Sequence, residues 1–330
     1  MSHLKAFRIA SAAGAVALSF AFPGLAEAAL SRAWVSSKGA DGAGCGAPTS
    51  PCRQIKYVLD NNIVAPGGEI DVLDPAGFAP VTITMAVSIV NDGAGTASVQ
   101  QGAAGGAAIT INAGANDAVH LRGLSIDGVR TGHYGVLFNS GASLDIVNCR
   151  IGNFARTGVV VQPTAGTVKL AVLKSSASNN AQFGILVNPA SAAVVKANFS
   201  QVVAQNNALI GIHVVGMNAT SAPFGVDMTM YGSDASSNGN YGVMSVSDAV
   251  NRSTGMTRVV VSQTTANQNY AGGFGALGDG VGGGAVMFLD RSVSIGGVYG
   301  DWFQFYSTST NYLKGNSADS FWNIFTASRQ

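Results

Sequence analysis

Charged residues are scarce in this 330-residue sequence: they make up 11% of it, against about 25% in an ordinary soluble domain. Lysine and arginine number 18, aspartate and glutamate number 17, and the formal net charge is +1. A nucleic-acid partner needs a basic surface that neutralises phosphates, so this balance argues against one. After the first thirty residues no apolar run reaches the roughly 18 residues of a membrane-spanning helix, and we expect no span in the mature chain.

Residues 1–29 have the pattern of a secretory signal peptide. Lys5 and Arg8 supply the positive start, residues 9–22 are apolar, and residues 26–28 match a small-residue cleavage site. An uncleaved membrane anchor is the alternative, but an apolar run of about 14 residues is short for a span. We therefore expect export to the periplasm, the cell surface or the medium.

Cysteine is rare, with three residues in the chain. Cys45 and Cys52 bracket a short proline-containing loop, and in an oxidising compartment we expect them to form a disulfide. Zinc binding by this pair is disfavoured, because no second pair of cysteines or histidines stands at zinc spacing. Cys149 lies in an apolar strand pattern, which predicts a buried, unreactive thiol.

Glycine is abundant, with 43 residues, and five of them mark an internal repeat. The residues fourteen and twelve positions before each of these glycines, and one position after it, are apolar. Apolar residues with a period of two, separated by tight turns and repeated in one frame, indicate short β-strands. The repeating glycines are Gly158, Gly184, Gly211, Gly242 and Gly273, spaced by 26, 27, 31 and 31 residues.

A repeat of this length without a helical pattern predicts a solenoid, whose coils stack their strands into parallel sheets. The expected hand is right, as for other parallel crossovers. We predict an all-β fold in which residues 30–66 hold the disulfide loop and a capping helix, and residues 67–330 form a right-handed parallel β-helix. One interior file is expected to contain Leu144, Leu170, Ala197, Met228 and Val259.

Asparagine recurs four and five residues before the repeating glycines. It tolerates the left-handed backbone of a tight turn, and stacked amides bond to one another along the axis. A structural ladder is our interpretation, and binding of sugar hydroxyls is the alternative. The residues concerned are Asn153, Asn179 and Asn206 five positions before the glycine, and Asn180, Asn207, Asn238 and Asn269 four positions before it.

Both ends of a solenoid need a cover. Residues 51–64 read as an amphipathic helix that places Ile55, Val58 and Leu59 on one stripe, which predicts an N-terminal cap. Aromatic residues gather near the C-terminus and predict a hydrophobic cap there, with a sugar-stacking platform as the alternative. They are Tyr299, Trp302, Phe303, Phe305, Tyr306, Tyr312, Phe321, Trp322 and Phe325.

The pattern resembles the pectate-lyase-like superfamily of right-handed parallel β-helix proteins, and more narrowly secreted bacterial repeat proteins of this type. The resemblance covers residues 33–325 and is carried by residues 33–36, 67–75 and 121–128, by Cys45 with Cys52, and by the Asn-x-x-x-x-Gly turns. Many members of the superfamily are polysaccharide lyases or hydrolases. The resemblance therefore implies contact with a glycan and leaves the activity unspecified.

Two charged clusters are candidates for chemistry. Glu69 and Asp71 face outward from one strand, and Asp74 follows at its end, which suggests glycan binding, an acid/base pair or calcium ligands. Hydrogen bonds of a turn are the alternative. The second cluster gives four weak candidates for catalysis on acidic sugars, and a solvated polar face is its alternative. These candidates are His120, Arg122, Asp127 and His133, with Asp117 and Arg130 nearby.

The outward positions of the repeated strands carry one carboxylate in ten, Asp145, too few for a calcium-and-base site on that sheet. We therefore predict no metal and no cofactor, with calcium as the alternative. One loop of the repeat grows from eight and nine residues to thirteen in two successive coils, which suggests a binding wall. Asn218 and Phe224 from this loop and Tyr231 on the adjacent strand are its candidates, and drift in a surface turn is the alternative.

The sequence predicts an exported β-helix protein that interacts with a glycan or acts as a cell-surface scaffold, with no evident catalysis. The first alternative is a polysaccharide lyase or hydrolase acting on uronate-containing glycans, with Arg122, His120, Glu69 and Asp71 as its residues. The second alternative is an adhesin-like structural module.

Overall fold

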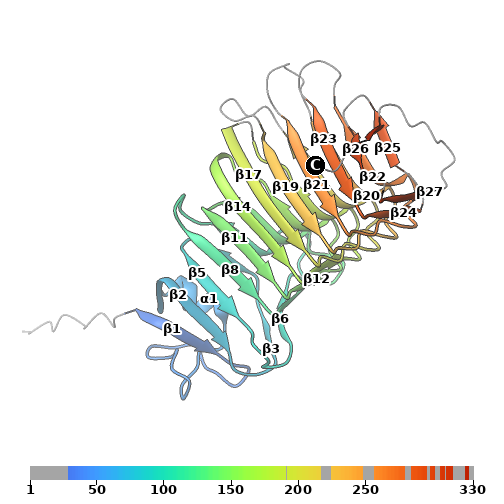
Figure 1. Cartoon of the computed structure of the whole chain (residues 1–330). Coiled ribbons are helices and arrows are strands. Elements are labelled where there is room, and N and C mark those ends of the chain that lie inside the picture. The colour runs from blue at the N-terminus through green and yellow to red at the C-terminus, as the bar shows by residue number, and fades with distance from the viewer. Residues whose placement is uncertain are drawn as a thin grey trace, which may run out of the picture.

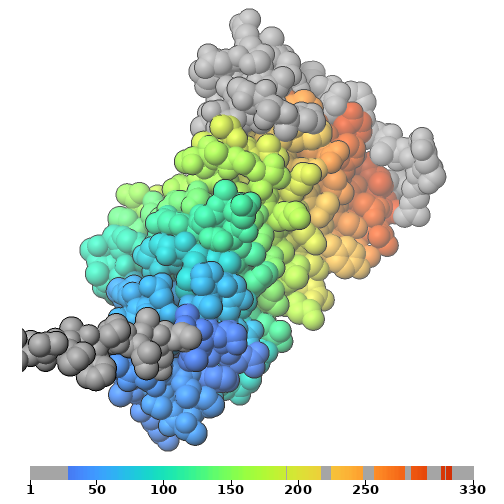
Figure 2. Space-filling view, turned by 90° about the vertical axis from the view of Figure 1, so that its left-hand side faces the viewer, coloured from blue at the N-terminus to red at the C-terminus, as the bar shows by residue number. Residues whose placement is uncertain are grey.

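The computed structural model describes residues 29–190, 192–216, 224–247, 256–278, 284–295, 298–301, 305–308, 310–314 and 324–326. In these ranges the chain is an all-β parallel solenoid with one short helix, and every paired strand runs parallel to its neighbours. The coils stack into an elongated body whose colour runs in order from the N-terminal to the C-terminal end (Figures 1 and 2). The predicted signal peptide lies almost wholly outside the described residues.

Three sheets form the walls, and a two-stranded pair, β24 (Val293–Ile295) and β27 (Tyr312–Lys314), continues one of them. The large sheet contains, in spatial order, β1 (Leu30–Val35), β2 (Val64–Val72), β5 (Val87–Val90), β8 (Ala118–Arg122), β11 (Ser143–Val147), β14 (Ala165–Leu173), β17 (Ala192–Ser200), β19 (Val226–Tyr231), β21 (Thr257–Ser262), β23 (Ala285–Asp290), β26 (Phe305–Ser307) and β28 (Ile324–Thr326). The nine-stranded sheet contains β25 (Val298–Asp301), β22 (Gly272–Leu277), β20 (Tyr241–Ser247), β18 (Ile210–Gly216), β16 (Phe183–Val187), β13 (Thr157–Val161), β10 (Tyr134–Ser140), β7 (Ala107–Asn112) and β4 (Val81–Ile83). The five-stranded sheet contains β15 (Ser176–Ser178), β12 (Arg150–Gly152), β9 (Leu124–Asp127), β6 (Ala97–Gln100) and β3 (Ala76–Phe78).

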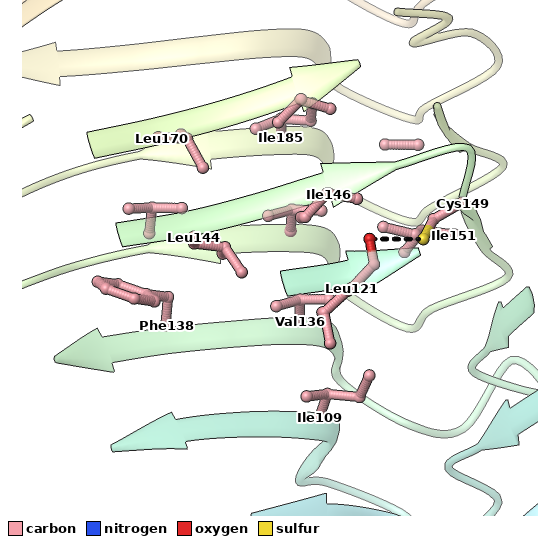
Figure 3. Packing of buried hydrophobic residues seen from close by; sticks show 14 of the residues in the cluster. Ile109, Leu121, Val136, Phe138, Leu144, Ile146, Cys149, Ile151, Leu170 and Ile185 are labelled. Carbon is pink, nitrogen blue, oxygen red and sulfur yellow. Dashed lines mark hydrogen bonds between the residues drawn. The ribbon is translucent and has the colours of Figure 1, made fainter. Parts of the chain in front are cut away.

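The predicted interior file is confirmed by the strand register. Leu144 pairs with Leu170, which pairs with Ala197, and the file continues through Met228 to Val259. Figure 3 shows side chains of the large sheet and of the nine-stranded sheet meeting inside the coil. Burial of this continuous core stabilises the stack at about 25 cal/mol per Å² of apolar surface removed from water.

Cys149 is buried at 2% exposure, as predicted, and its Sγ lies 3.6 Å from the carbonyl oxygen of Leu121 (Figure 3). Burial raises the pKa of its thiol to about 11, so the unreactive thiol form persists at neutral pH. Cys45 and Cys52 form the predicted disulfide.

The asparagine ladder is also confirmed. Asn180 Nδ2 donates to Asn207 Oδ1 at 2.9 Å, Asn207 to Asn238 at 3.0 Å, and Asn238 to Asn269 at 3.1 Å, all buried. The residue before each ladder amide is left-handed, with φ between 55° and 61°. The repeating glycines are required here, because a Cβ on Gly158 would lie 2.9 Å from Asn180 Nδ2.

The N-terminal cap is the helix α1 (Ile55–Asp60), which buries Ile55, Val58 and Leu59 against the first coils. It is shorter than the predicted 51–64, because Asn62 is left-handed at φ 51° and Val64 already pairs with Leu30. Most of the side chains of the predicted aromatic C-terminal cap lie outside the described residues. No helix within the described ranges has the length and apolar character needed to cross a membrane.

Candidate functional site

The outer face of the large sheet collects the outward-pointing residues of all its strands in straight rows. In one row Glu69 pairs through Ser88 with His120, and in the next Asp71 pairs through Val90 with Arg122. Two residues from each charged cluster, Glu69 and Asp71 from one and His120 and Arg122 from the other, therefore lie on one face with β5 between them. We call their outward side chains the paired-charge patch, and it consists of Arg32, Glu69, Asp71, Asp92, His120, Arg122 and Asp145.

Every cation of the paired-charge patch contacts a carboxylate. Arg32 Nη2 lies 2.5 Å from Glu69 Oε1, and Arg32 Nε lies 3.3 Å from Asp71 Oδ2. Arg122 Nε lies 2.8 Å from Asp92 Oδ1. His120 Nδ1 lies 2.7 Å from Asp145 Oδ2, in the next coil. The cations of the patch are thus all paired, four carboxylates stand against three basic side chains, and the ion pairs are half exposed, where each contributes at most about 1 kcal/mol.

Asp71 is the carboxylate of this patch whose environment disfavours its charge. Burial raises its pKa above the usual range, repulsion from Glu69 and Asp92 adds to the rise, and attraction to Arg32 opposes it. A carboxyl group of raised pKa beside basic side chains is the type of group that general acid–base catalysis uses.

The acidic side chains of the described ranges do not converge as a set of calcium ligands. Calcium requires several oxygen ligands that converge on one point. Within the described residues, the one set of three acidic, histidine or cysteine side chains whose ligand atoms converge is Asp41, Cys45 and Cys52. Both sulfurs of that set are consumed by the disulfide, so it holds no metal.

Three predicted residues lie away from the outer face of the large sheet. Asp74 caps a turn, where it accepts hydrogen bonds from Ser36 Oγ at 2.7 Å and Ser37 N at 2.6 Å, and these bonds lower its pKa. Asp127 ends β9 in the five-stranded sheet, and its oxygens accept from Val129 N and Asn153 Nδ2. His133 lies just before β10, edge-on to Tyr134.

A groove crosses the outer face farther along the large sheet, over β17, β19, β21 and β23. Its volume is about 630 Å³. Asp227 and Arg258 in one row form a bidentate pair, with Arg258 Nε and Nη2 at 2.8 and 2.5 Å from the two carboxylate oxygens. We call this the sheet groove, and its outward side chains are Lys196, Asn198, Asp227, Thr229, Arg258, Val260 and Phe288.

Aromatic rings border the sheet groove. Phe288 stacks on Tyr306 with ring centroids 4.8 Å apart and planes 10° from parallel. The Phe224 ring lies under the Arg258 guanidinium, 4.6 Å from it, and Tyr231 is 49% exposed in the adjacent row. Two predicted binding residues, Phe224 and Tyr231, are therefore placed at or near this groove, while Asn218 lies outside the described residues.

The sequence analysis missed most of the sheet groove. Fifteen positions before the repeating glycines stand Ser143, Lys169, Lys196, Asp227 and Arg258. Four of these five residues are charged, and they follow one another in successive coils. Alignment of the row on the repeating glycines therefore predicts the polar wall of the groove. Phe288 lies after Gly273, the last repeating glycine, so its place in the repeat could not be counted from such a glycine.

No family model matches the sequence, and no curated protein matches it. Among solved structures, the chain is similar to the crystal structure of pectate lyase Pel9A, with a TM-score of 0.54 and 13% sequence identity. The match covers 89% of this chain and 82% of that chain. The fold is a pectate-lyase-like parallel β-helix. At this identity the likeness concerns the fold alone, so chemistry must be argued from the side chains of this pectate-lyase-like β-helix.

Side chains of this β-helix support binding in the sheet groove more than hydrolysis there by a pair of carboxyl groups. Both oxygens of Asp227 accept from Arg258, and no second carboxylate lines the groove within the described residues. Glycosidic hydrolysis requires two cooperating carboxyl groups. The groove instead combines an apolar floor at Val260 and Phe288 with amide, hydroxyl and ammonium groups.

Proposed function

We propose that this protein is an exported β-helix protein that binds a polysaccharide in the sheet groove without cleaving it. The observation that carries the proposal is the composition of the groove, in which polar outward side chains on β17 and β19 lie beside apolar ones on β21 and β23. A volume of about 630 Å³ lies within the range of about 300–1,000 Å³ typical of ligand sites. The similar solved structure is that of a pectate lyase, which supports a polysaccharide as the ligand class.

Each part of the groove has a role that suits a sugar chain. Phe288, held in place by Tyr306, offers a flat face to the apolar side of a pyranose ring. Asn198 and Thr229, joined by a contact of 3.4 Å, supply donors and acceptors for hydroxyls. Lys196 forms no ion pair with a described residue, so its ammonium is available for a carboxylate or hydroxyl of the glycan.

Export is supported by the Cys45–Cys52 disulfide, because such bonds persist in oxidising compartments. It is also supported by the signal-like pattern of residues 1–29. Both observations fit a protein that meets polysaccharides outside the cytoplasm.

Retention on a glycan array and affinity electrophoresis with the purified mature chain test the proposal. We expect binding to at least one polysaccharide, at least tenfold weakened by Phe288→Ala and weakened by Asn198→Ala. Arg122→Ala, in the paired-charge patch, is the matched control and should bind as the parent does. Absence of retention on every glycan would refute binding and leave a structural scaffold or adhesin-like module.

A second candidate function, a polysaccharide lyase or hydrolase, is favoured by one observation, the raised pKa of Asp71 beside Arg32 and near Arg122. Incubation with polygalacturonate and alginate, with and without calcium, tests it. Unsaturated or reducing ends that appear with the parent and disappear with Arg122→Ala would establish catalysis at the paired-charge patch. Product formation that survives Arg122→Ala would place catalysis elsewhere.

A further inference from the structure

A second hollow lies on a different face, at the corner where the large sheet turns into the five-stranded sheet. Figure 1 marks this corner of the coil by the label of β12. The volume of the hollow is about 470 Å³, within the range of ligand sites. We call it the corner pocket, and the polar side chains that line it include Ser125, Arg150, Lys174 and Ser176.

The corner pocket carries positive charge without compensation. No carboxylate is among its lining residues, and neither Arg150 nor Lys174 forms an ion pair with any described residue. Asp127 lines the adjoining hollow with Arg150, but its oxygens accept from Val129 N and Asn153 Nδ2, and it forms no ion pair with Arg150. This contrasts with Arg32 and the other arginines of the outer face of the large sheet, which are all paired.

Hydroxyl groups flank the guanidinium. Arg150 pairs in register with Ser125 on one side and Ser176 on the other, so the three side chains leave adjacent strands about 4.8 Å apart. Neither serine hydroxyl is engaged by another described residue. Two hydroxyl donors therefore stand beside the arginine fork with no partner within the described chain.

Lys174 adopts an unfavourable backbone conformation at this corner. Its φ is 50°, a left-handed conformation that is unfavourable for a lysine by about 1 kcal/mol. The equivalent corner is also left-handed in neighbouring coils, where it is occupied by Gly123, Asn148, Gln201 and Gly232, so the conformation belongs to the repeat and lysine adds an ammonium there. The Lys174 N–H is already bound to the Ser200 carbonyl, so the ammonium, and not the backbone, is what this residue presents to the pocket.

We propose that the corner pocket binds a tetrahedral oxyanion, a sulfate or phosphate group, either as a free ion or as an ester on a polysaccharide. Arg150 supplies a planar fork of donors, Lys174 supplies an ammonium, and Ser125 and Ser176 supply hydroxyls. These donors exceed what the two oxygens of a carboxylate accept, and they match a group with three or four oxygens. The site is separate from the sheet groove and does not depend on glycan binding there.

Calorimetric titration of the mature chain with sodium sulfate, phosphate and acetate at constant ionic strength tests the proposal. We expect sulfate or phosphate to bind at least tenfold more tightly than acetate, and the Arg150→Gln/Lys174→Gln double variant to lose at least tenfold of that affinity. Lys38→Gln/Arg156→Gln removes the same charge elsewhere and should bind as the parent does. Equal affinity for acetate, or sulfate binding that survives the double variant, would overturn the proposal.

Two further arms complete the test. Arg150→Lys keeps the charge and loses the fork, so it should weaken sulfate binding several-fold even if the double variant does not fold, and unchanged binding would count against the proposal. A sulfated galactan and the same galactan after desulfation identify the source of the oxyanion. Tighter binding of the sulfated form, lost in Arg150→Lys, indicates a sulfate ester, and equal binding of both forms, together with tight binding of free sulfate, indicates a free ion.

Discussion

Phe154 and Asn180 occupy the same position in neighbouring coils, four residues before the repeating glycine, and they divide the solenoid into two halves. On the N-terminal side the Phe154 ring fills the corner so closely that a Cβ on Gly128 would lie 2.5 Å from it. On the C-terminal side the corner is filled by the amide ladder that begins at Asn180. Phe154 N donates to Asn180 Oδ1 at 3.2 Å, so the amide ladder ends against the corner that Phe154 fills.

The outer face of the large sheet changes between the same two halves. The N-terminal half carries the paired-charge patch, in which acids and bases satisfy one another. The C-terminal half carries the sheet groove, where a single ion pair leaves apolar and hydrogen-bonding groups exposed. The comparison shows that one repeat geometry accepts either chemistry, because coil stacking depends on the interior files and not on the outer rows.

The largest expected effect separates the two kinds of corner. Asn207→Ala removes the acceptor of the Asn180 amide and the donors to Ala177 O and Asn238 Oδ1, and leaves these groups buried. We expect a loss of about 3 kcal/mol or more in local unfolding free energy, since each unsatisfied buried group costs about 1–3 kcal/mol. Native-state hydrogen exchange is the measurement, because repeat arrays do not unfold in one step.

Phe154→Leu is the matched change at the apolar corner. Its expected cost is smaller, about 1–2 kcal/mol, because a large apolar side chain replaces another and the corner repacks. If Asn207→Ala costs less local unfolding free energy than Phe154→Leu, the amides of the ladder contribute less to stability than the apolar packing of the corner.

The second prediction concerns the outer face. Phe288→Ala should weaken glycan retention at least tenfold, because a central aromatic anchor contributes about 1.4 kcal/mol or more. Val90→Ala, on the same face in the N-terminal half, should leave retention unchanged. Equal losses from both variants, measured by affinity electrophoresis, would mean that the two halves bind as one surface.

The periodic features of the fold could be predicted from the sequence. The interior file of Leu144 and the ladder from Asn180 to Asn269 recur at fixed distances from the repeating glycines. Because the coils stack on one another, residues at the same position of the repeat come into contact. The helix α1 was predicted too long, because its C-terminal end is set by pairing of Val64 with Leu30, a contact that the local pattern does not encode.

The candidate site was predicted less well, for a related reason. Asp92 contacts Arg122, and Arg32 contacts Glu69, across coils that precede the first repeating glycine. No repeating glycine aligns these segments with one another, so their register could not be predicted and the two clusters could not be joined. Asp227 and Arg258 do share a frame position, and their pairing was accessible to the same reasoning.

The third prediction uses two carboxylates of the N-terminal half. Hydrogen bonds from Ser36 and Ser37 lower the pKa of Asp74, so its stabilisation is present above the unfolded-state pKa and is lost as pH falls through the folded-state pKa. Burial raises the pKa of Asp71, so the protein is most stable with this group protonated, and that stability is lost as pH rises through the folded-state pKa.

The substitutions should accordingly have opposite signs. At pH 7 Asp74→Asn should lower Tm and Asp71→Asn should raise it, each by about 1–2 °C because both groups are partly solvated. Near pH 2 both variants should melt with the parent. Thermal melts across this pH range are the measurement, and shifts of the same sign at pH 7 would contradict the assignment of burial as the dominant influence on Asp71.

The smallest expected effect compares one arginine from each half. Arg258 grips both oxygens of Asp227 and covers the Phe224 ring, and its hydrogen bond to Asp227 raises its pKa. Arg32 instead divides its contacts between Glu69 and Asp71. A lysine keeps the positive charge but cannot form the bidentate contact with both carboxylate oxygens. Arg258→Lys should therefore lower the unfolding free energy by less than about 1 kcal/mol. Arg32→Lys should cost less, because single contacts survive the change. If hydrogen exchange gives equal costs, the bidentate geometry beside the sheet groove adds nothing to a simple charge pair.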